Sequence, residues 1–125
     1  MSTVSATRPR LGFLGVGWIG RNRMEAIAGA RTADIALVAD PSAACVEAAL
    51  AAAPEAAEAG GFDELLAAGL DGIAIATPSA LHAAQATAAL EAGVAVFCQK
   101  PLARTAAETR AVIDAARTAD RLLGA

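Results

Sequence analysis

The chain has 125 residues, of which 56% are hydrophobic and 18% charged, and its formal net charge is −3. A chain of this length buries roughly two-thirds of the surface that its unfolded form exposes, which is enough for one core and excludes two separate domains. The charge is mildly acidic and no run of basic residues occurs, so we expect neither nucleic acid nor a membrane as a partner.

Three further features of the sequence predict a cytoplasmic protein. Residues 1–9 form a polar arm, expected to be flexible, and contain no apolar run of the length that a signal peptide requires. No later segment approaches about 18 uncharged apolar residues, the length of a membrane-spanning helix. Cys45 and Cys98 lack the close spacing of metal ligands, so we expect small core side chains in a reducing compartment and no metal site.

Apolar runs and helical patterns alternate along residues 10–125. The runs that predict strands lie, in chain order, at residues 11–14, 35–39, 56–59, 72–76 and 94–98. The helical patterns between and after them run up to Gly29, from Ser42 to Pro54, from Asp63 to Ala68, from Ser79 to Glu91 and onward from Thr105. Ser42 and Ser79 stand where helix caps are expected, and Thr105 has the spacing of a capping box with Glu108.

This alternation predicts a doubly wound α/β fold of the Rossmann type, with a parallel sheet of order 3-2-1-4-5 between two layers of helices. The runs at 72–76 and 94–98 are apolar at every position, which is typical of strands covered on both faces. Residues 122–125 look like the first residues of a sixth strand that is otherwise missing. The strand at 94–98 then becomes an apolar edge, and such an edge predicts self-association.

A glycine motif, G-x-G-x-x-G, stands between the first strand and the first helix. In this context Gly15 turns the chain tightly, Gly17 lets the backbone approach a pyrophosphate, and Gly20 lets the helix pack closely on the sheet. The helix N-terminus then presents unpaired N–H groups to the phosphates. The alternative is an ordinary flexible turn, but the strand before the motif and the helix after it favour dinucleotide binding.

Asp40 ends the second strand, 20 residues after Gly20, where a carboxylate can accept hydrogen bonds from the ribose hydroxyls of the adenosine. An aspartate before proline is also a common turn residue. The carboxylate would repel a 2′-phosphate, and no Arg or Lys lies between Val38 and Glu58 to offset that repulsion. The sequence therefore favours NAD over NADP.

Lys100, the only lysine of the chain, follows the fifth strand within Gln99-Lys100-Pro101. The carboxyl ends of strands are where ligands bind in open α/β sheets, and an ammonium there can donate to a substrate oxygen or stabilise an alkoxide. A solvated surface lysine is the alternative. We predict that Lys100 is the catalytic residue.

Between the fourth strand and the next helix lie Thr77, Pro78 and Ser79, which shape the nicotinamide side of the pocket or cap the helix, followed by His82. His82 is either an acid or base, or a packing residue. Trp18 either lines the cofactor groove or covers the sheet. The predicted cofactor-binding residues are Gly15, Val16, Gly17, Trp18, Ile19, Gly20, Asp40, Thr77, Pro78, Ser79, His82, Gln99, Lys100 and Pro101.

Four segments in this order make the chain resemble the nucleotide-binding half of the Gfo/Idh/MocA family, named after glucose-fructose oxidoreductase, inositol dehydrogenase and rhizopine catabolism. They are GFLGVGWIG at 12–20, VADP at 38–41, ATPSALH at 76–82 and ALEAGVAVFCQKPLA at 89–103. The resemblance implies hydride transfer between nicotinamide and a carbinol carbon of a sugar, cyclitol or related polyol. It also implies that Lys100 contacts the reacting oxygen and that a cis bond before Pro101 orients it.

The chain departs from the family pattern in two respects. Gln99 stands where the family usually has Glu, so a carboxylate that would pair with Lys100 is replaced by a neutral amide. The family's second domain, which supplies the substrate pocket and usually the main acid or base, is missing from the 125 residues. We therefore expect cofactor binding without turnover; the alternatives are a dinucleotide-binding or regulatory module that acts with a partner chain, and a scaffold with a degenerate site.

Overall fold

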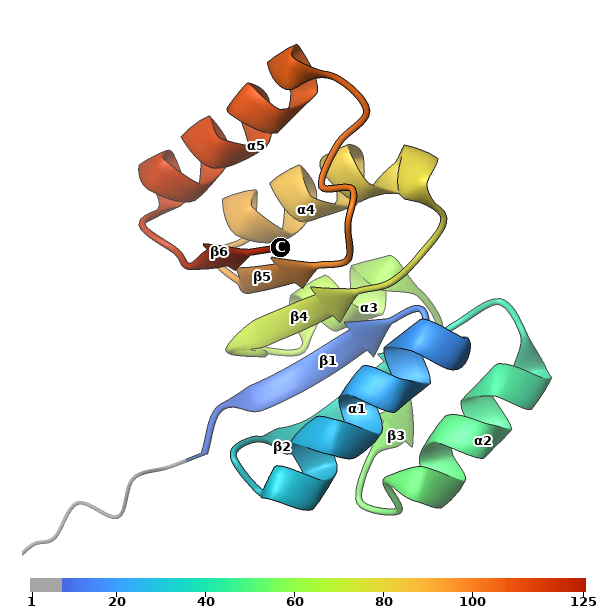
Figure 1. Ribbon diagram of the computed structural model, residues 1–125. Helices are drawn as coiled ribbons and strands as arrows, with labels where there is room; N and C mark the ends of the chain where they lie inside the picture. The colour runs from blue at the N-terminus through green and yellow to red at the C-terminus, as the bar shows by residue number, and fades with distance from the viewer. Residues whose placement is uncertain (1–7) are drawn as a thin grey trace, which may run out of the picture.

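A six-stranded parallel sheet forms the centre of the molecule in the computed structural model, which describes residues 8–125 (Figure 1). Its strands lie in the order β3-β2-β1-β4-β5-β6. Their bounds are Arg10–Leu14 for β1, Asp34–Ala39 for β2, Ala57–Glu58 for β3, Gly72–Ile75 for β4, Ala95–Cys98 for β5 and Leu123–Gly124 for β6. The doubly wound α/β prediction is confirmed, while most of the arm predicted at residues 1–9 lies outside the described residues.

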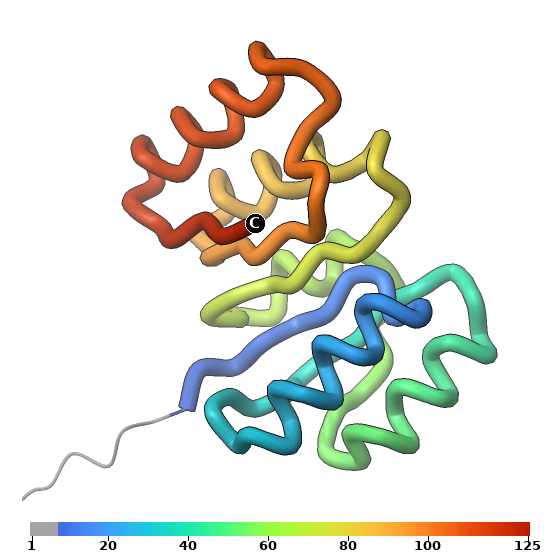
Figure 2. Tube along the Cα trace, in the orientation of Figure 1, coloured from blue at the N-terminus to red at the C-terminus, as the bar shows by residue number. Residues whose placement is uncertain are grey.

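In the described part of the chain, five α-helices connect the strands and cover both faces of the sheet. They are α1 (Trp18–Ala30), α2 (Ala43–Ala52), α3 (Phe62–Ala67), α4 (His82–Glu91) and α5 (Ala106–Ala119), with a short 3-10 helix, η1 (Ser79–Leu81), ahead of α4. The tube in Figure 2 shows α1 and α2 on one side of the strands and α4 and α5 on the other. Within residues 8–125, no helix combines the length and the apolar character needed to cross a membrane.

The prediction of a missing sixth strand was wrong. β6 pairs in parallel with β5 through Val96 with Leu123 and Phe97 with Gly124, and the Val96 N–H donates to the Leu122 carbonyl at 2.9 Å. The sequence placed the start of this strand at residues 122–125, but so short a pattern did not show that it already pairs with β5. β5 is bonded to β4 on one side and to β6 on the other, so it is not an edge strand. The reason for which self-association was expected therefore no longer holds.

Two helix caps form as predicted and one does not. The Ser42 hydroxyl accepts from the Cys45 N–H at 3.3 Å, and the Thr105 hydroxyl accepts from the Glu108 N–H at 3.1 Å. Ser79, by contrast, makes no cap to α4, which was wrongly predicted to begin there. Pro78 is extended and its carbonyl accepts from the Leu81 N–H, so η1 intervenes and α4 starts three residues later.

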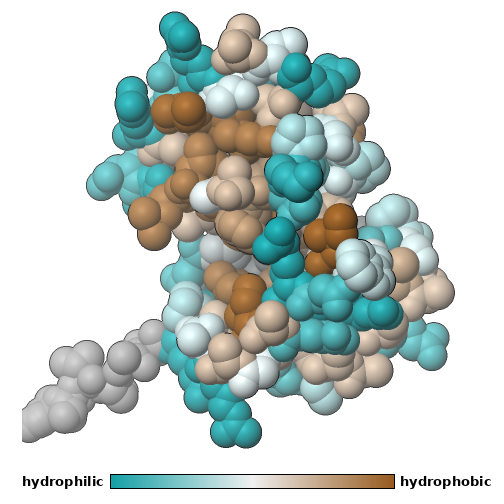
Figure 3. Space-filling view, in the orientation of Figure 1, coloured by the Kyte–Doolittle hydropathy of each residue, from teal (hydrophilic) through white to brown (hydrophobic). Residues whose placement is uncertain are grey.

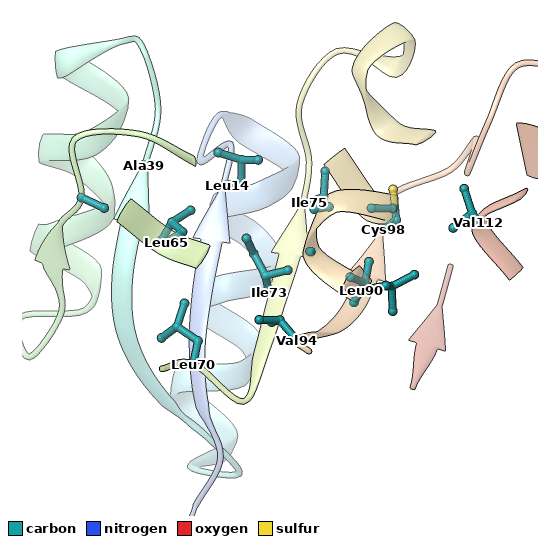
Figure 4. Close-up of a cluster of buried hydrophobic side chains, with 14 residues drawn as sticks. Leu14, Ala39, Leu65, Leu70, Ile73, Ile75, Leu90, Val94, Cys98 and Val112 are labelled. Carbon is teal, nitrogen blue, oxygen red and sulfur yellow. The ribbon is translucent and has the colours of Figure 1, made fainter. Parts of the chain in front are cut away.

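The core divides into two clusters, one on each face of the sheet. Figure 4 shows the larger cluster, which joins Leu65 of α3, Leu90 of α4 and Val112 of α5 to Ile73 and Ile75 of β4 and Cys98 of β5, with Val112 on the Cys98 side. The smaller cluster joins the other face to α1 and α2; its largest side chains are Phe13, Met24, Ile35, Val38 and Val46. Each such side chain contributes about 1.5–3 kcal/mol when fully buried, so packing on both faces fixes the strand ends that bear the predicted site.

Candidate functional site

The ends of four neighbouring strands form one row along the carboxyl edge of the sheet. Leu14 pairs in register with Ala39 on one side and with Ile75 on the other, and Ile75 pairs with Cys98. The four loops that follow these residues therefore leave the same edge, as Figure 1 shows. They contain most of the residues predicted to bind the cofactor; Trp18, Ile19 and Gly20 form the first turn of α1, Ser79 begins η1 and His82 begins α4. The edge is the place where open parallel sheets bind ligands.

The first loop has the geometry that its three glycines predict. Gly15 has a φ of +90°, and a Cβ on it would lie 2.6 Å from the Ala76 carbonyl oxygen. A Cβ on Gly20 would collide with the Gly15 carbonyl, so α1 approaches the sheet as closely as a backbone can. A Cβ on Gly17 would meet nothing within 4 Å, which leaves open space where a phosphate can approach the main chain.

The N-terminus of α1 opens onto that space. The helix has 13 residues, its first position follows Gly17, no side chain caps it, and no acidic residue occupies its first turn. The N–H groups of the first turn are therefore free to bind an anion, with the positive end of the helix dipole behind them. Trp18 and Ile19 point outward from this turn, with Trp18 76% exposed. This cradle fits the pyrophosphate of a dinucleotide.

Asp40 ties the end of β2 to the glycine loop. Its Oδ2 accepts from the Val16 N–H at 2.9 Å and its Oδ1 accepts from the Ser42 N–H at 2.8 Å. Sequence reasoning considered a turn residue and a ribose acceptor as alternatives, and the geometry allows both. Each carboxylate oxygen that accepts one hydrogen bond retains a further lone pair, which a ribose hydroxyl can use.

The third loop is held from beneath by two polar side chains of α4. The Thr77 hydroxyl donates to Gln85 Oε1 at 2.6 Å, and the Thr77 carbonyl lies 2.8 Å from Nε2 of His82. The other ring nitrogen of His82, Nδ1, lies 2.7 Å from the Pro101 carbonyl. His82 is only 1% exposed, so its ring supports the loops rather than facing the open edge. Pro78 and Ser79 are exposed at that edge.

The fourth loop places Lys100 at the surface between two anchored neighbours. The Gln99 N–H donates to the Ile75 carbonyl at 2.8 Å, and the peptide bond between Lys100 and Pro101 is cis, as the family resemblance implied. Oε1 of Gln99 accepts from Nε and Nη2 of Arg23 at 3.0 and 2.7 Å. The Arg23 guanidinium also lies over the Phe97 ring, 5.0 Å from its centroid.

Sequence reasoning missed Arg23 and Phe97. Arg23 is one of nine arginines and lies 76 residues before Gln99, and nothing in its local pattern distinguishes it. The only available signal was the uncharged Gln99 itself, which still needed a partner for its side-chain oxygen.

The two cysteines are free, as the sequence predicted. Cys98 ends β5 inside the larger core cluster with no exposed surface, and burial raises the pKa of its thiol to about 11. Cys45 is half-buried on α2.

A parallel sheet of this order, with a glycine loop that opens a helix and an acidic residue after the second strand, defines a dinucleotide-binding domain of the Rossmann type. The sequence model of the Gfo/Idh/MocA oxidoreductase family, described as an NAD-binding Rossmann fold, matches residues 9–125. The chain therefore belongs to this family, which confirms the resemblance.

Individual relatives agree with that assignment. Inositol 2-dehydrogenase of Acidiphilium cryptum is 37% identical over 111 residues, which are 85% of this chain and 32% of the relative. The WlbA dehydrogenase from Bordetella pertussis, solved with NADH and UDP-GlcNAcA, superposes with a TM-score of 0.84 at 29% identity, covering 97% of this chain and 36% of that one. Biliverdin reductase from Synechocystis sp. PCC 6803, solved with biliverdin and NADP+, gives 0.85 at 29% identity, covering 92% and 36%. The chain spans about a third of the length of the curated relatives that it matches.

Proposed function

We propose that the chain is the NAD-binding part of an oxidoreductase that acts on a sugar, a cyclitol or a related polyol. The observation that supports this most directly is the row of four strand ends, which gathers the glycine loop, Asp40, Thr77 and Lys100 along one edge. The similarity to inositol 2-dehydrogenases supports a polyhydroxylated substrate.

In this proposal the glycine loop and α1 bind the pyrophosphate. The main-chain N–H groups at the start of α1 donate to its oxygens, Gly17 leaves room for it, and Val16, Trp18 and Ile19 complete the loop that encloses it. Asp40 accepts hydrogen bonds from the adenosine ribose. Its negative charge opposes a 2′-phosphate by about 1 kcal/mol at 4 Å in water and about 4 kcal/mol at an effective dielectric of 20, so we propose NAD rather than NADP.

The β4 and β5 loops bind the nicotinamide half. Thr77, Pro78 and Ser79 flank it on one side, and Gln99, Lys100 and Pro101 lie on the other, with His82 beneath both. The bound nicotinamide supplies a hydride acceptor or donor at its C4. Lys100 presents Nζ to the reacting oxygen, donates a hydrogen bond to it and stabilises the negative charge that develops there.

The 125 residues alone are expected to bind cofactor without turning over substrate. Hydride transfer requires a substrate held at contact distance in a site closed to water, whereas Trp18 and Lys100 lie exposed at an open edge. The part of the relatives that this chain matches is about a third of their length.

Cofactor titration by calorimetry, with the fluorescence of Trp18 as a second signal, tests the proposal. NADH is expected to bind at millimolar concentration or below and more tightly than NADPH. Gly17→Asp, which places a carboxylate in the open space of the glycine loop, is expected to abolish binding while leaving the fold intact. Failure of a folded wild-type chain to bind millimolar NADH would contradict the proposed function.

A further inference from the structure

The segment Gln99–Pro101 is fastened on both sides of Lys100. On the side before Lys100, the Gln99 N–H is bonded to β4 and its Oε1 accepts two hydrogen bonds from Arg23. On the side after Lys100, the Pro101 carbonyl lies 2.7 Å from Nδ1 of His82. Lys100 itself is exposed and has no hydrogen bond of its own among the described residues.

Arg23 makes the first fastening from α1. Its planar guanidinium donates to one amide oxygen through two N–H groups and stacks on Phe97, so it fixes the direction of the Gln99 side chain as well as its position. Arg23 lies only three residues beyond Gly20 on the same helix. The glycine loop and the end of β5 are therefore linked through α1.

His82 makes the second fastening from α4, on the opposite face of the sheet. Its two ring nitrogens lie within hydrogen-bond distance of the Thr77 and Pro101 carbonyls, and the tautomer decides which nitrogen donates, because a neutral ring carries one N–H. The ring is almost fully buried, and a buried hydrogen bond that is lost leaves a carbonyl unsatisfied and away from water. A side chain without donors at position 82 therefore removes the hydrogen bond that the ring makes between α4 and these loops.

We propose that Arg23 and His82 are positioning residues for Lys100: they hold its two neighbours in the chain from opposite faces of the sheet, and neither needs to touch the substrate. The reason is entropic. A lysine side chain has a long flexible stem, so its ammonium can be directed at a reacting oxygen only if the backbone at its base is rigid. This inference rests on the proposed role of Lys100. It gives a role to two residues, Arg23 and His82, that belong neither to the glycine motif nor to the Gln99–Pro101 segment.

Amide hydrogen exchange, followed by NMR on the whole chain, tests the fastening directly. His82→Phe keeps an aromatic ring of similar size without a donor, and Arg23→Leu removes the guanidinium. Each is expected to speed exchange of the Gln99 amide about tenfold, because local opening exposes its bond to Ile75, while the Phe13 amide in the centre of β1 is unchanged. His82→Gln, which retains an N–H donor, should recover part of the protection, and Glu91→Gln at the exposed end of α4 is the matched control.

Comparing the affinities for ADP and NADH distinguishes a positioning role from a general effect on the fold, because a general effect would weaken both ligands. ADP contacts only the half formed by the glycine loop and Asp40, whereas NADH reaches both halves. The His82→Phe and Arg23→Leu variants are expected to weaken NADH about tenfold and to leave ADP unchanged. Unchanged exchange at Gln99, equally faster exchange at Phe13, or equal losses of NADH and ADP would overturn the inference. If the wild type binds neither ligand, the proposed function fails, whereas the exchange result still decides whether the two residues fix the segment.

Discussion

The two halves of the candidate site are built in different ways. In the half formed by the β1 and β2 loops, groups of these loops and strand ends fix the geometry: the Gly15 N–H donates to the Ala39 carbonyl at 2.9 Å, and the Asp40 carboxylate accepts from the Val16 and Ser42 N–H groups. In the half formed by the β4 and β5 loops, side chains of α1 and α4 do so, namely Arg23 and His82. The first half is therefore fixed by contacts between its own loops, and the second by side chains that two helices bring to it.

Among these substitutions, Gly20→Ala in the first half is expected to reduce NADH affinity most. A Cβ there collides with the Gly15 carbonyl, so α1 must move away from the sheet and the phosphate cradle is lost. NADH affinity should fall more than ~100-fold, with a lower melting temperature. Gly29→Ala in the same helix has open space around its Cβ and is the control, with a stability gain of about 0.5–1 kcal/mol. Equal behaviour of the two variants would show that the close approach of α1 is unimportant.

The reactivity of Cys98 measures how readily the end of β5, in the second half of the site, opens to solvent. Burial raises the pKa of Cys98 to about 11, so its reactive thiolate at pH 8 is about 100-fold scarcer than in an unburied thiol. Iodoacetamide with mass spectrometry should label Cys45 first. The folded state also keeps the Cys98 proton longer than the unfolded chain, so stability should decline as the pH rises from 9 towards 11. Rapid labelling of Cys98 at pH 8 in the wild type would mean that the end of β5 opens readily.

The Asp40→Asn substitution tests whether the charge of Asp40 sets the preference for NADH over NADPH. The charge is removed while one side-chain oxygen remains to accept a backbone N–H, so repulsion of a 2′-phosphate disappears and the loop is largely kept. We expect the preference for NADH over NADPH to fall about tenfold in calorimetric titrations. A ratio identical to that of the wild type would assign Asp40 to the turn alone.

The smallest effect is expected from Gln99→Glu. The contact with Arg23 then becomes an exposed ion pair, which contributes about 0.2–1 kcal/mol and weakens as salt is added. Thermal unfolding at low and high ionic strength measures the gain. If the variant is less stable than the wild type at low salt, Arg23 is held by Phe97 rather than by position 99.

This contrast also explains what the sequence alone could predict. The glycine loop, Asp40 and the Ser42 cap were predicted because their residue types and their spacing in the sequence are characteristic. Ser79 failed as a cap because Pro78 imposes one turn of η1 first, and the pairing of β6 was missed because two residues make too short a pattern. Arg23 and the partners of His82 depend on which helix packs beside which loop, and that information is absent from any local window.

Helix α1 also sets a length. It begins at the phosphate cradle with Trp18 and reaches Gln99 with Arg23, five residues later, an axial span of about 7.5 Å at 1.5 Å per residue. In the proposed function, this span separates the main-chain groups that bind the pyrophosphate from the Gln99 side chain in the nicotinamide half. One residue inserted between Trp18 and Arg23 would rotate the guanidinium about 100° around the helix axis, which keeps the start of α1 in place but removes the contact with Gln99.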